Sequence, residues 1–260
     1  MAGTFSLSYT PDDDFCPIPL LTSGAASRGV RAGLSLAKAG DMALSRRTEL
    51  PWRDRFLSGL GAETSSVFAL HQVHSRNVLV IGCQAPRSLV GVEGDGMVSD
   101  RPDALLTVTV ADCLPVFLAD KGRGAYGIVH SGWKGTGIVR EALRLMTKAF
   151  GTAPAEVLAV LGPCIGTCCY RVQHARYEKF RLDFGDHAVA RGPGPDDYRL
   201  DLRAANVELL AQAGVSDIRV ASDCTCCSPA LGSFRRQGPE SFTRMLAFIG
   251  HLSPTSRACA

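Results

Sequence analysis

Three residues of types that bind metals or act in catalysis each follow a stretch of apolar residues. They are His74 after residues 67–73, Cys113 after residues 104–110, and His130 after residues 125–129. Strand ends at one edge of a sheet bring distant residues together on a rigid base. Two imidazoles and one thiolate suit a borderline-soft ion such as zinc, and three protein ligands leave a fourth position for water or substrate. The three residues therefore predict an open, catalytic metal site.

The same residues have other interpretations. A cysteine after an apolar strand is commonly a small buried hydrophobe, a histidine is commonly just hydrogen-bonded, and no compact His-Glu-x-x-His motif is present. Cys113 as nucleophile with His130 as its base would instead make a metal-free cysteine hydrolase. His71 lies three positions from His74 along an expected strand, which places it on the opposite face and outside the ligand set.

Asp112 precedes Cys113 directly and is the candidate catalytic carboxylate. It is expected to orient a metal-bound histidine or to act as general acid or base. The alternative is a carboxylate that only caps the loop.

The chain contains 10 cysteines. In a chain of this size without a secretion signal, free thiols or metal ligands are expected, and we predict no disulfides. The region with Cys164, Cys168 and Cys169 together with Cys224, Cys226 and Cys227 could form a non-enzymatic metal-binding or interaction module. Two Cys-x-x-Cys pairs at finger-like spacing are lacking, so buried thiols are the favoured explanation.

Hydrophobic periodicity predicts alternating strands and helices. Strands are predicted at 67–70 and 78–81 (as a pair), at 104–110, 115–119 and 125–129 (as a central sheet), and at 157–161 and 218–221. Helices are predicted at 46–60, 138–146 (with Gly151 where its C-terminal cap belongs), 175–180 and 202–213, and 244–249 suits either state. Residues 23–29 are typical of a loop or a strand edge and could form a lid, and 192–195 are typical of an exposed loop. We predict an α/β (α+β) fold of mixed β-sheets flanked by helices, in a single domain over residues 1–260.

Composition restricts the partners. With 28 basic and 25 acidic residues, the net charge of +3 does not indicate nucleic-acid binding. No signal peptide or membrane-spanning stretch is recognisable, which predicts a cytoplasmic protein without membrane contact. A small molecule is the expected partner, and the oligomeric state is left open.

Several motifs occur in the order typical of one family. They are HQVH at 71–74, ADCLPV at 111–116, HSGWKG at 130–135 and LGPCIG at 161–166, followed by CCY at 168–170, CT at 224–225 and FRR at 234–236. In these motifs the chain resembles the YfiH-like family, historically called laccase-domain or multicopper polyphenol oxidoreductases. It departs from the family pattern at Lys134 and Arg171, where arginine and glutamate are usual, and at Thr22-Ser23 and Ser35.

The resemblance implies that His74, Cys113 and His130 bind one metal, zinc or alternatively copper. It also implies purine nucleoside phosphorylase activity, with methylthioadenosine phosphorylase and adenosine deaminase activities. The competing description is copper-dependent oxidation of phenols. A trinuclear copper centre draws on many imidazoles, and the whole chain has 6 histidines, which argues against a laccase cluster.

Phosphorolysis requires purine nucleosides and phosphate as partners, with cationic groups near the phosphate. Arg235, Arg236 and Lys134 are the candidate substrate-binding cations. Arginine matches phosphate bidentately, whereas lysine acts as a point charge, so the two arginines are preferred. The alternative is a solvated basic turn.

Overall fold

The structure is a computed structural model, which describes residues 2–10, 12–20, 29–44, 51–85, 89 and 91–252. The strands are β1 (Gly3–Phe5), β2 (Phe15–Pro17), β3 (Arg31–Ser35), β4 (Val67–Ala69), β5 (Val78–Ile81), β6 (Gly96–Ser99), β7 (Leu105–Val110), β8 (Leu114–Asp120), β9 (Tyr126–Ser131), β10 (Val157–Leu161), β11 (Arg171–Val172), β12 (Val189–Arg191), β13 (Tyr198–Leu200), β14 (Asp217–Ala221) and β15 (Met245–Gly250). The α-helices are α2 (Pro51–Gly59), α3 (Ile138–Phe150), α4 (His174–Phe184), α5 (Leu202–Gln212) and α6 (Phe234–Gln237). Short 3-10 helices are η1 (Ala37–Ala39), η2 (Thr64–Ser66), η3 (Pro154–Glu156) and η4 (Asp186–Ala188).

The strands form three sheets. A seven-stranded sheet has the order β1-β14-β10-β8-β9-β6-β5, a five-stranded sheet has the order β2-β3-β15-β7-β4, and β11-β13-β12 form a small third sheet. Pairing is mixed: β4 runs parallel to β7 and β5 parallel to β6, whereas β8 is antiparallel to both β9 and β10. This confirms the predicted α/β fold with mixed sheets flanked by helices.

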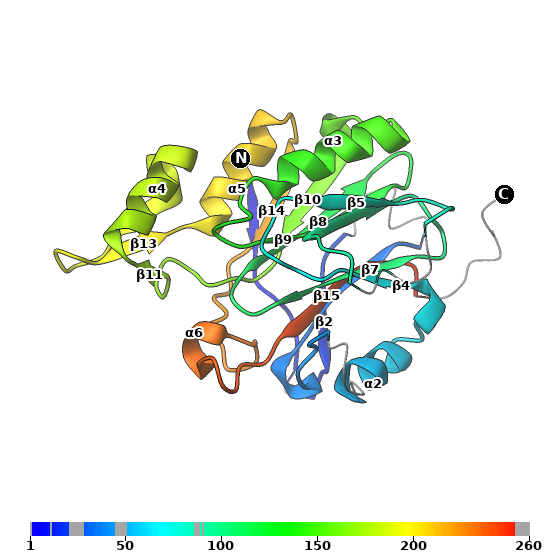
Figure 1. Cartoon of the computed structure of the whole chain (residues 1–260), viewed down its shortest axis with the longest axis horizontal. Coiled ribbons are helices and arrows are strands. Elements are labelled where there is room, and N and C mark those ends of the chain that lie inside the picture. The colour runs from blue at the N-terminus through cyan, green and yellow to red at the C-terminus, as the bar shows by residue number, and fades with distance from the viewer. Residues whose placement is uncertain are drawn as a thin grey trace.

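The two large sheets pack face to face. Phe117 and Ile128 of the seven-stranded sheet share one buried cluster with Leu106 and Ala247 of the five-stranded sheet. The outer face of the seven-stranded sheet is covered by α3 and α5, and that of the five-stranded sheet by α2. Figure 1 shows α3 and α2 on opposite sides of the stacked sheets, with α4 and the small sheet to one side. Strands buried on both faces read as continuous apolar runs, which is why β8 is recognisable in the sequence.

Helix α3 ends where its sequence predicts. Its apolar residues recur at helical spacing and are buried, and Gly151 follows it in the left-handed conformation with φ 68°. The Gly151 N–H donates to the Thr147 carbonyl at 3.0 Å, which satisfies a carbonyl at the helix end.

Two predicted strand pairings are wrong. β4 pairs with β7 and β5 pairs with β6, so the two do not pair with each other. Likewise, β7 belongs to the five-stranded sheet, whereas β8 and β9 belong to the seven-stranded sheet. Apolar patterns identify strands but not their partners, because both sheets are buried alike. The chain passes from the five-stranded to the seven-stranded sheet twice, after β4 and after β7.

The other predicted elements differ mainly at their ends. The helix predicted at 46–60 is observed as α2, and its first residues, 46–50, lie outside the described residues. Residues 244–249 form a strand, β15. Most of the predicted 23–29 loop lies outside the described residues, and 192–195 connects β12 to β13 with Pro193 and Pro195 exposed. No helix in the described part of the chain is long and apolar enough to span a membrane.

Candidate metal centre

The structure brings His74, Cys113 and His130 together. One ligand atom from each lies within 4.8 Å of those of the other two. The two imidazole rings are 4.9 Å apart between centroids and inclined at 72°. His130 is buried, Cys113 is half-buried and His74 is exposed. The group is thus held from the protein side and open toward solvent on one side, as the three-ligand prediction requires.

The crossovers between the sheets position two of the three residues. His74 lies in the segment between β4 and β5 with φ 59°, and Cys113 follows Asp112, which has φ 84°. Positive φ in a residue other than glycine is strained and is concentrated at functional sites. His130 lies within β9 rather than after it, one position before the strand ends. A Cβ on Gly132 would lie 2.9 Å from the Cys113 sulfur, so only glycine leaves room there for the ligand group.

Asp95, which the sequence analysis does not single out, joins the ligands. Its buried carboxylate accepts a hydrogen bond from the His74 backbone N–H at 3.0 Å and contacts His130 Nδ1 at 2.8 Å. It also accepts from the backbone N–H and the hydroxyl of Ser75 at 2.6 and 2.7 Å. With Nδ1 engaged, His130 presents Nε2 as its ligand atom, and such a carboxylate behind an imidazole is usual in metal sites.

Charges within the group stabilise one another. Burial alone would raise the pKa of Cys113, but the charge of His130 and hydrogen bonds from His130 and His74 lower it to about 6. Burial alone would lower the pKa of His130, but Cys113 and Asp95 raise it to about 9. Burial likewise opposes ionisation of Asp95, yet hydrogen bonds from His130 and Ser75 lower its pKa to about 2. Without a metal, the site holds a thiolate beside an imidazolium.

Asp112 does not contact a ligand histidine; Asp95 takes the predicted role of orienting one. The Asp112 carboxylate accepts hydrogen bonds from the Thr225 hydroxyl and the Arg235 backbone N–H, both at 2.6 Å. It holds two distant segments beside Cys113, which is close to the capping role that the sequence also allowed. Asp112 also borders the cavity that contains His74, Cys113 and His130.

The ligand group lies in a cavity of about 550 Å³. Aromatic side chains supply much of its wall, namely Trp133, Tyr170, Phe234 and Phe242, and arginines supply the cationic part, namely Arg176, Arg235 and Arg244. Burial raises the pKa of Tyr170, so its phenol stays protonated. The cavity combines flat apolar surfaces with cations next to the candidate metal ligands.

Of the three cations predicted to bind substrate, only Arg235 borders the cavity. Arg235 borders the cavity, and its guanidinium donates to the carbonyls of Cys169 and Arg171. Arg236 lies outside the cavity lining and donates to backbone carbonyls, including that of Ser228 at 2.7 Å. Lys134 is exposed, with its ammonium 5.7 Å from the centre of the Trp133 ring.

Arg176 and Arg244 border the cavity but were not predicted. The Arg176 guanidinium lies 4.4 Å from the Trp133 ring centre, and no carboxylate of the described residues forms an ion pair with it. Arg244 pairs with Asp41 at 2.8 Å. An arginine on a helix such as α4 looks like an ordinary solvated residue in the sequence, because only the tertiary fold turns it toward Trp133.

Comparison with known proteins places the chain in a family. The sequence model of the family described as "Multi-copper polyphenol oxidoreductase laccase" matches residues 27–251. The chain belongs to this family. The motif resemblance noted above is thereby confirmed.

Named relatives of this laccase family cover most of the chain. "Purine nucleoside phosphorylase YlmD" of Geobacillus stearothermophilus is 32% identical over 240 residues, which are 87% of this chain and 86% of the relative. "Purine nucleoside phosphorylase" of Deinococcus radiodurans is 34% identical over 230 residues, 88% of this chain and 86% of the relative. The crystal structure of the hypothetical protein YfiH of Bacillus licheniformis superimposes with a TM-score of 0.81 at 28% identity, covering 94% of this chain and 100% of that one.

The laccase family description and the His/Cys/His group together suggest a bound metal. The residues present fit a metal ion. Asp95 fixes the His130 ring, the neighbouring histidines stabilise the Cys113 thiolate, and Gly132 leaves space beside the Cys113 sulfur. Among the described residues, the groups of potential ligands contain just two histidines, His74 and His130. That donor set suits a single ion rather than the several ions of the family's name.

The remaining cysteines correct one prediction. Eight described cysteines are free thiols. Cys83, exposed in the turn after β5, is disulfide-bonded, so the prediction of no disulfides is wrong at that residue. Position in an exposed turn gives its thiol access to a partner that the spacing of cysteines in the sequence does not reveal. Cys168 and Cys227 are also exposed, so burial, the favoured explanation for the cysteines of that region, does not account for all of them.

Proposed function

We propose that this protein is a purine nucleoside phosphorylase that also has methylthioadenosine phosphorylase and adenosine deaminase activities, with zinc held by His74, Cys113 and His130. The observation that carries the proposal is the position of these residues in a cavity walled by aromatic and arginine side chains. The names of the relatives from Geobacillus stearothermophilus and Deinococcus radiodurans support the substrate class.

The cavity offers groups for binding the purine base and the phosphate. Trp133, Tyr170 and Phe234 present apolar surfaces suited to a purine ring, and Arg176 and Arg235 suit phosphate. In phosphorolysis a phosphate oxygen bonds to C1′ of the ribose while the bond from C1′ to N9 breaks. The electron pair of that bond passes to the base, which takes up a proton. Zinc, when bound, supplies the Lewis acidity that activates water for attack on adenine C6 in deamination.

The test is product analysis on metal-analysed protein. Adenosine and inosine are incubated with and without phosphate, and adenine, hypoxanthine, inosine and ribose 1-phosphate are separated by chromatography. We expect ribose 1-phosphate only when phosphate is present, and conversion of adenosine to inosine in either case. Absence of every product from both nucleosides would refute the proposal.

A cysteine hydrolase is the second candidate, favoured by the thiolate and imidazolium character of Cys113 and His130. A chelator separates the two functions. Activity on adenosine that survives complete metal removal but is lost on alkylation of Cys113 would favour the hydrolase. Loss of activity on chelation, and its return with zinc, would favour the metal enzyme.

Copper-dependent oxidation of phenols is the alternative that the family description offers. Copper binds nitrogen and sulfur ligands more tightly than zinc does, so a single copper at this group could oxidise phenols adventitiously. Comparison of the zinc-loaded and copper-loaded protein decides between the two. Nucleoside turnover by the zinc form, together with phenol oxidation confined to the copper form, supports the phosphorylase.

A further inference from the structure

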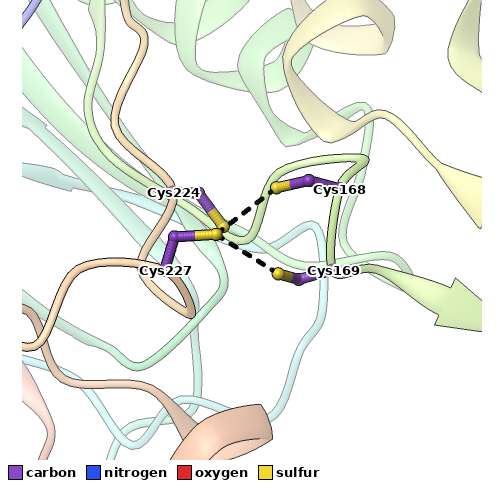
Figure 2. A group of neighbouring side chains, drawn as sticks. All are labelled: Cys168, Cys169, Cys224 and Cys227. Carbon is purple, nitrogen blue, oxygen red and sulfur yellow. Dashed lines mark hydrogen bonds between the residues drawn. The ribbon is translucent and has the colours of Figure 1, made fainter.

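A second group of potential ligands lies outside the His/Cys/His group. The sulfurs of Cys168, Cys169, Cys224 and Cys227 all lie within 4.8 Å of one another. Figure 2 shows these side chains pointing toward a common centre from two separate loops. We propose that these four cysteines bind one zinc ion as thiolates, in a closed structural site distinct from the candidate catalytic centre.

The fold brings the two loops together. Strands β10 and β14 are parallel neighbours, so the loops that follow them leave the same edge of the seven-stranded sheet. An isolated parallel β-bridge between the backbones of Cys164 and Cys224 extends this pairing, and the Thr225 N–H donates to the Cys164 carbonyl at 3.1 Å. The approach of the four sulfurs therefore rests on backbone pairing rather than on flexible side chains alone.

The distances suit a single ion. The Cys227 sulfur lies 3.7 Å from that of Cys168 and 3.5 Å from that of Cys169. A zinc–sulfur bond of about 2.3 Å in tetrahedral geometry separates neighbouring sulfurs by about 3.8 Å. Disulfide bonds would need sulfurs about 2.05 Å apart, and all four residues are free thiols. The spacing is thus that of four thiolates around one ion.

The backbone around the sulfurs is arranged as in thiolate sites. The Gly166 N–H donates to the Cys224 sulfur at 3.2 Å. The N–H groups of Cys227 and Ser228 both donate to the Cys224 carbonyl, which forms a tight turn that returns Cys227 toward Cys224. A Cβ on Gly166 would lie 3.2 Å from the Cys168 sulfur, so the glycine lets the loop pack against the group. Hydrogen bonds to ligand sulfurs are a usual outer contact of such sites.

Nearby cations offset the charge. Zinc with four thiolates carries a net charge of two minus. The guanidinium of Arg235 donates to the Cys169 carbonyl at 2.8 Å, and that of Arg236 to the Cys226 carbonyl at 3.1 Å. Neither arginine forms an ion pair with a carboxylate in the described part of the chain. These contacts give Arg236 a role beside the cysteines rather than at a substrate.

An ion here would fix part of the cavity wall. Tyr170, directly after Cys169, borders the cavity, and Thr225, directly after Cys224, donates to Asp112 beside Cys113. The ion would join these two segments covalently through its ligands, which stabilises the wall against opening.

Metal analysis of the whole purified chain tests the proposal. We expect two zinc ions per wild-type chain, one in Cys227→Ser and Cys169→Ser, and one in Cys113→Ser. Cys226→Ser is the matched control, because Cys226 lies between two ligands but its sulfur is not in the group; it should keep both ions. Cobalt-substituted Cys113→Ser should show the intense thiolate-to-cobalt charge-transfer absorption of a tetrathiolate site.

A titration that needs no substitution among the four proposed ligand cysteines complements the analysis. A mercurial is added stepwise to Cys113→Ser while released zinc is measured with a coloured chelator. We expect one zinc to be released as four thiols react. The proposal would be overturned if the wild type binds no zinc, or binds a single ion that is lost in Cys113→Ser. Equal loss of zinc from Cys226→Ser and Cys227→Ser would also overturn it. Because Cys113→Ser removes only the other ion, failure of the His/Cys/His assignment would be recognised separately.

Discussion

At the scale of single residues, the Asp95 carboxylate connects His74 to His130. It accepts from the backbone of one and contacts the ring of the other, so it fixes the separation of two candidate ligands. Asp95→Asn removes the charge that favours the ligand orientation of His130. We expect a loss in zinc affinity of about 10- to 100-fold, measured by competition with a chelator of known affinity.

The control is Asp120→Asn. Asp120 is also a buried carboxylate that accepts backbone N–H groups, from Gly122 and Arg123, but it lies away from the ligand group. It should lose stability and keep its zinc affinity. A similar affinity loss in both variants would show that Asp95 acts through general stability.

Proton competition predicts the pH dependence of zinc binding. The pKa of Cys113 is lowered to about 6 and that of His130 is raised to about 9, so between these values the pair holds one proton. Binding must displace that proton. Zinc affinity should therefore rise about tenfold per pH unit from pH 6 to 9 and level off above.

The same shifts offset each other in the stability of the metal-free protein. The raised pKa of His130 stabilises the fold below its ordinary value of 6.5, and this contribution is lost as the pH rises through about 9. The lowered pKa of Cys113 stabilises the fold above its ordinary value of 9.0, and this contribution is lost as the pH falls through about 6. Thermal unfolding without metal should therefore change little between pH 6.5 and 9, whereas zinc affinity should rise, and titrations of both check this difference. An affinity independent of pH over this interval would contradict the thiolate and imidazolium pair.

At the scale of elements, helix α4 brings an arginine to the cavity. Arg176 lies over Trp133 and forms no ion pair with a described carboxylate, so its charge is available to phosphate. Arg176→Ala should raise the KM for phosphate by about 10- to 100-fold, as expected for loss of hydrogen bonds to a charged group. Deamination of adenosine, which uses no phosphate, should change little.

Arg191→Ala serves as the matched control. Arg191 lies 4.3 Å from the Tyr198 ring centre, in a similar cation–π contact outside the cavity. Its KM for phosphate should equal that of the wild type. If Arg176→Ala impairs deamination as strongly as phosphorolysis, the arginine contacts the nucleoside instead.

The elements that the sequence predicts well are those whose signals are local. Helix α3 follows from apolar spacing and Gly151, and β8 from a continuous apolar run. Asp95 lies between two glycines, a pattern that reads as a turn, and its role depends on a hydrogen bond to β9. The motifs were enough to predict His74, Cys113 and His130 as candidate ligands. The strand pairings that bring these residues together are tertiary contacts, which leave no local pattern in the sequence.

At the scale of the whole molecule, stability depends on the interface between the two large sheets. Phe117 is fully buried there among residues of both sheets. Phe117→Ala should lower the free energy of unfolding by about 3–5 kcal/mol, measured by chemical denaturation. Leu182→Ala, whose leucine is 76% exposed, should change it by less than about 0.5 kcal/mol. A loss below about 1 kcal/mol for Phe117→Ala would show that the sheets are not mutually stabilising.

The two segments that pass from the five-stranded to the seven-stranded sheet make the spacing of the ligands depend on both sheets. His74 and Cys113 lie on the segments that pass from the five-stranded to the seven-stranded sheet, whereas His130 belongs to the seven-stranded sheet alone. Sliding of one sheet over the other would therefore change the spacing of the ligands directly. The spacing of the ligand atoms thus depends on how the two sheets are aligned. Substitutions deep between the sheets, far from any substrate, should therefore change the metal affinity.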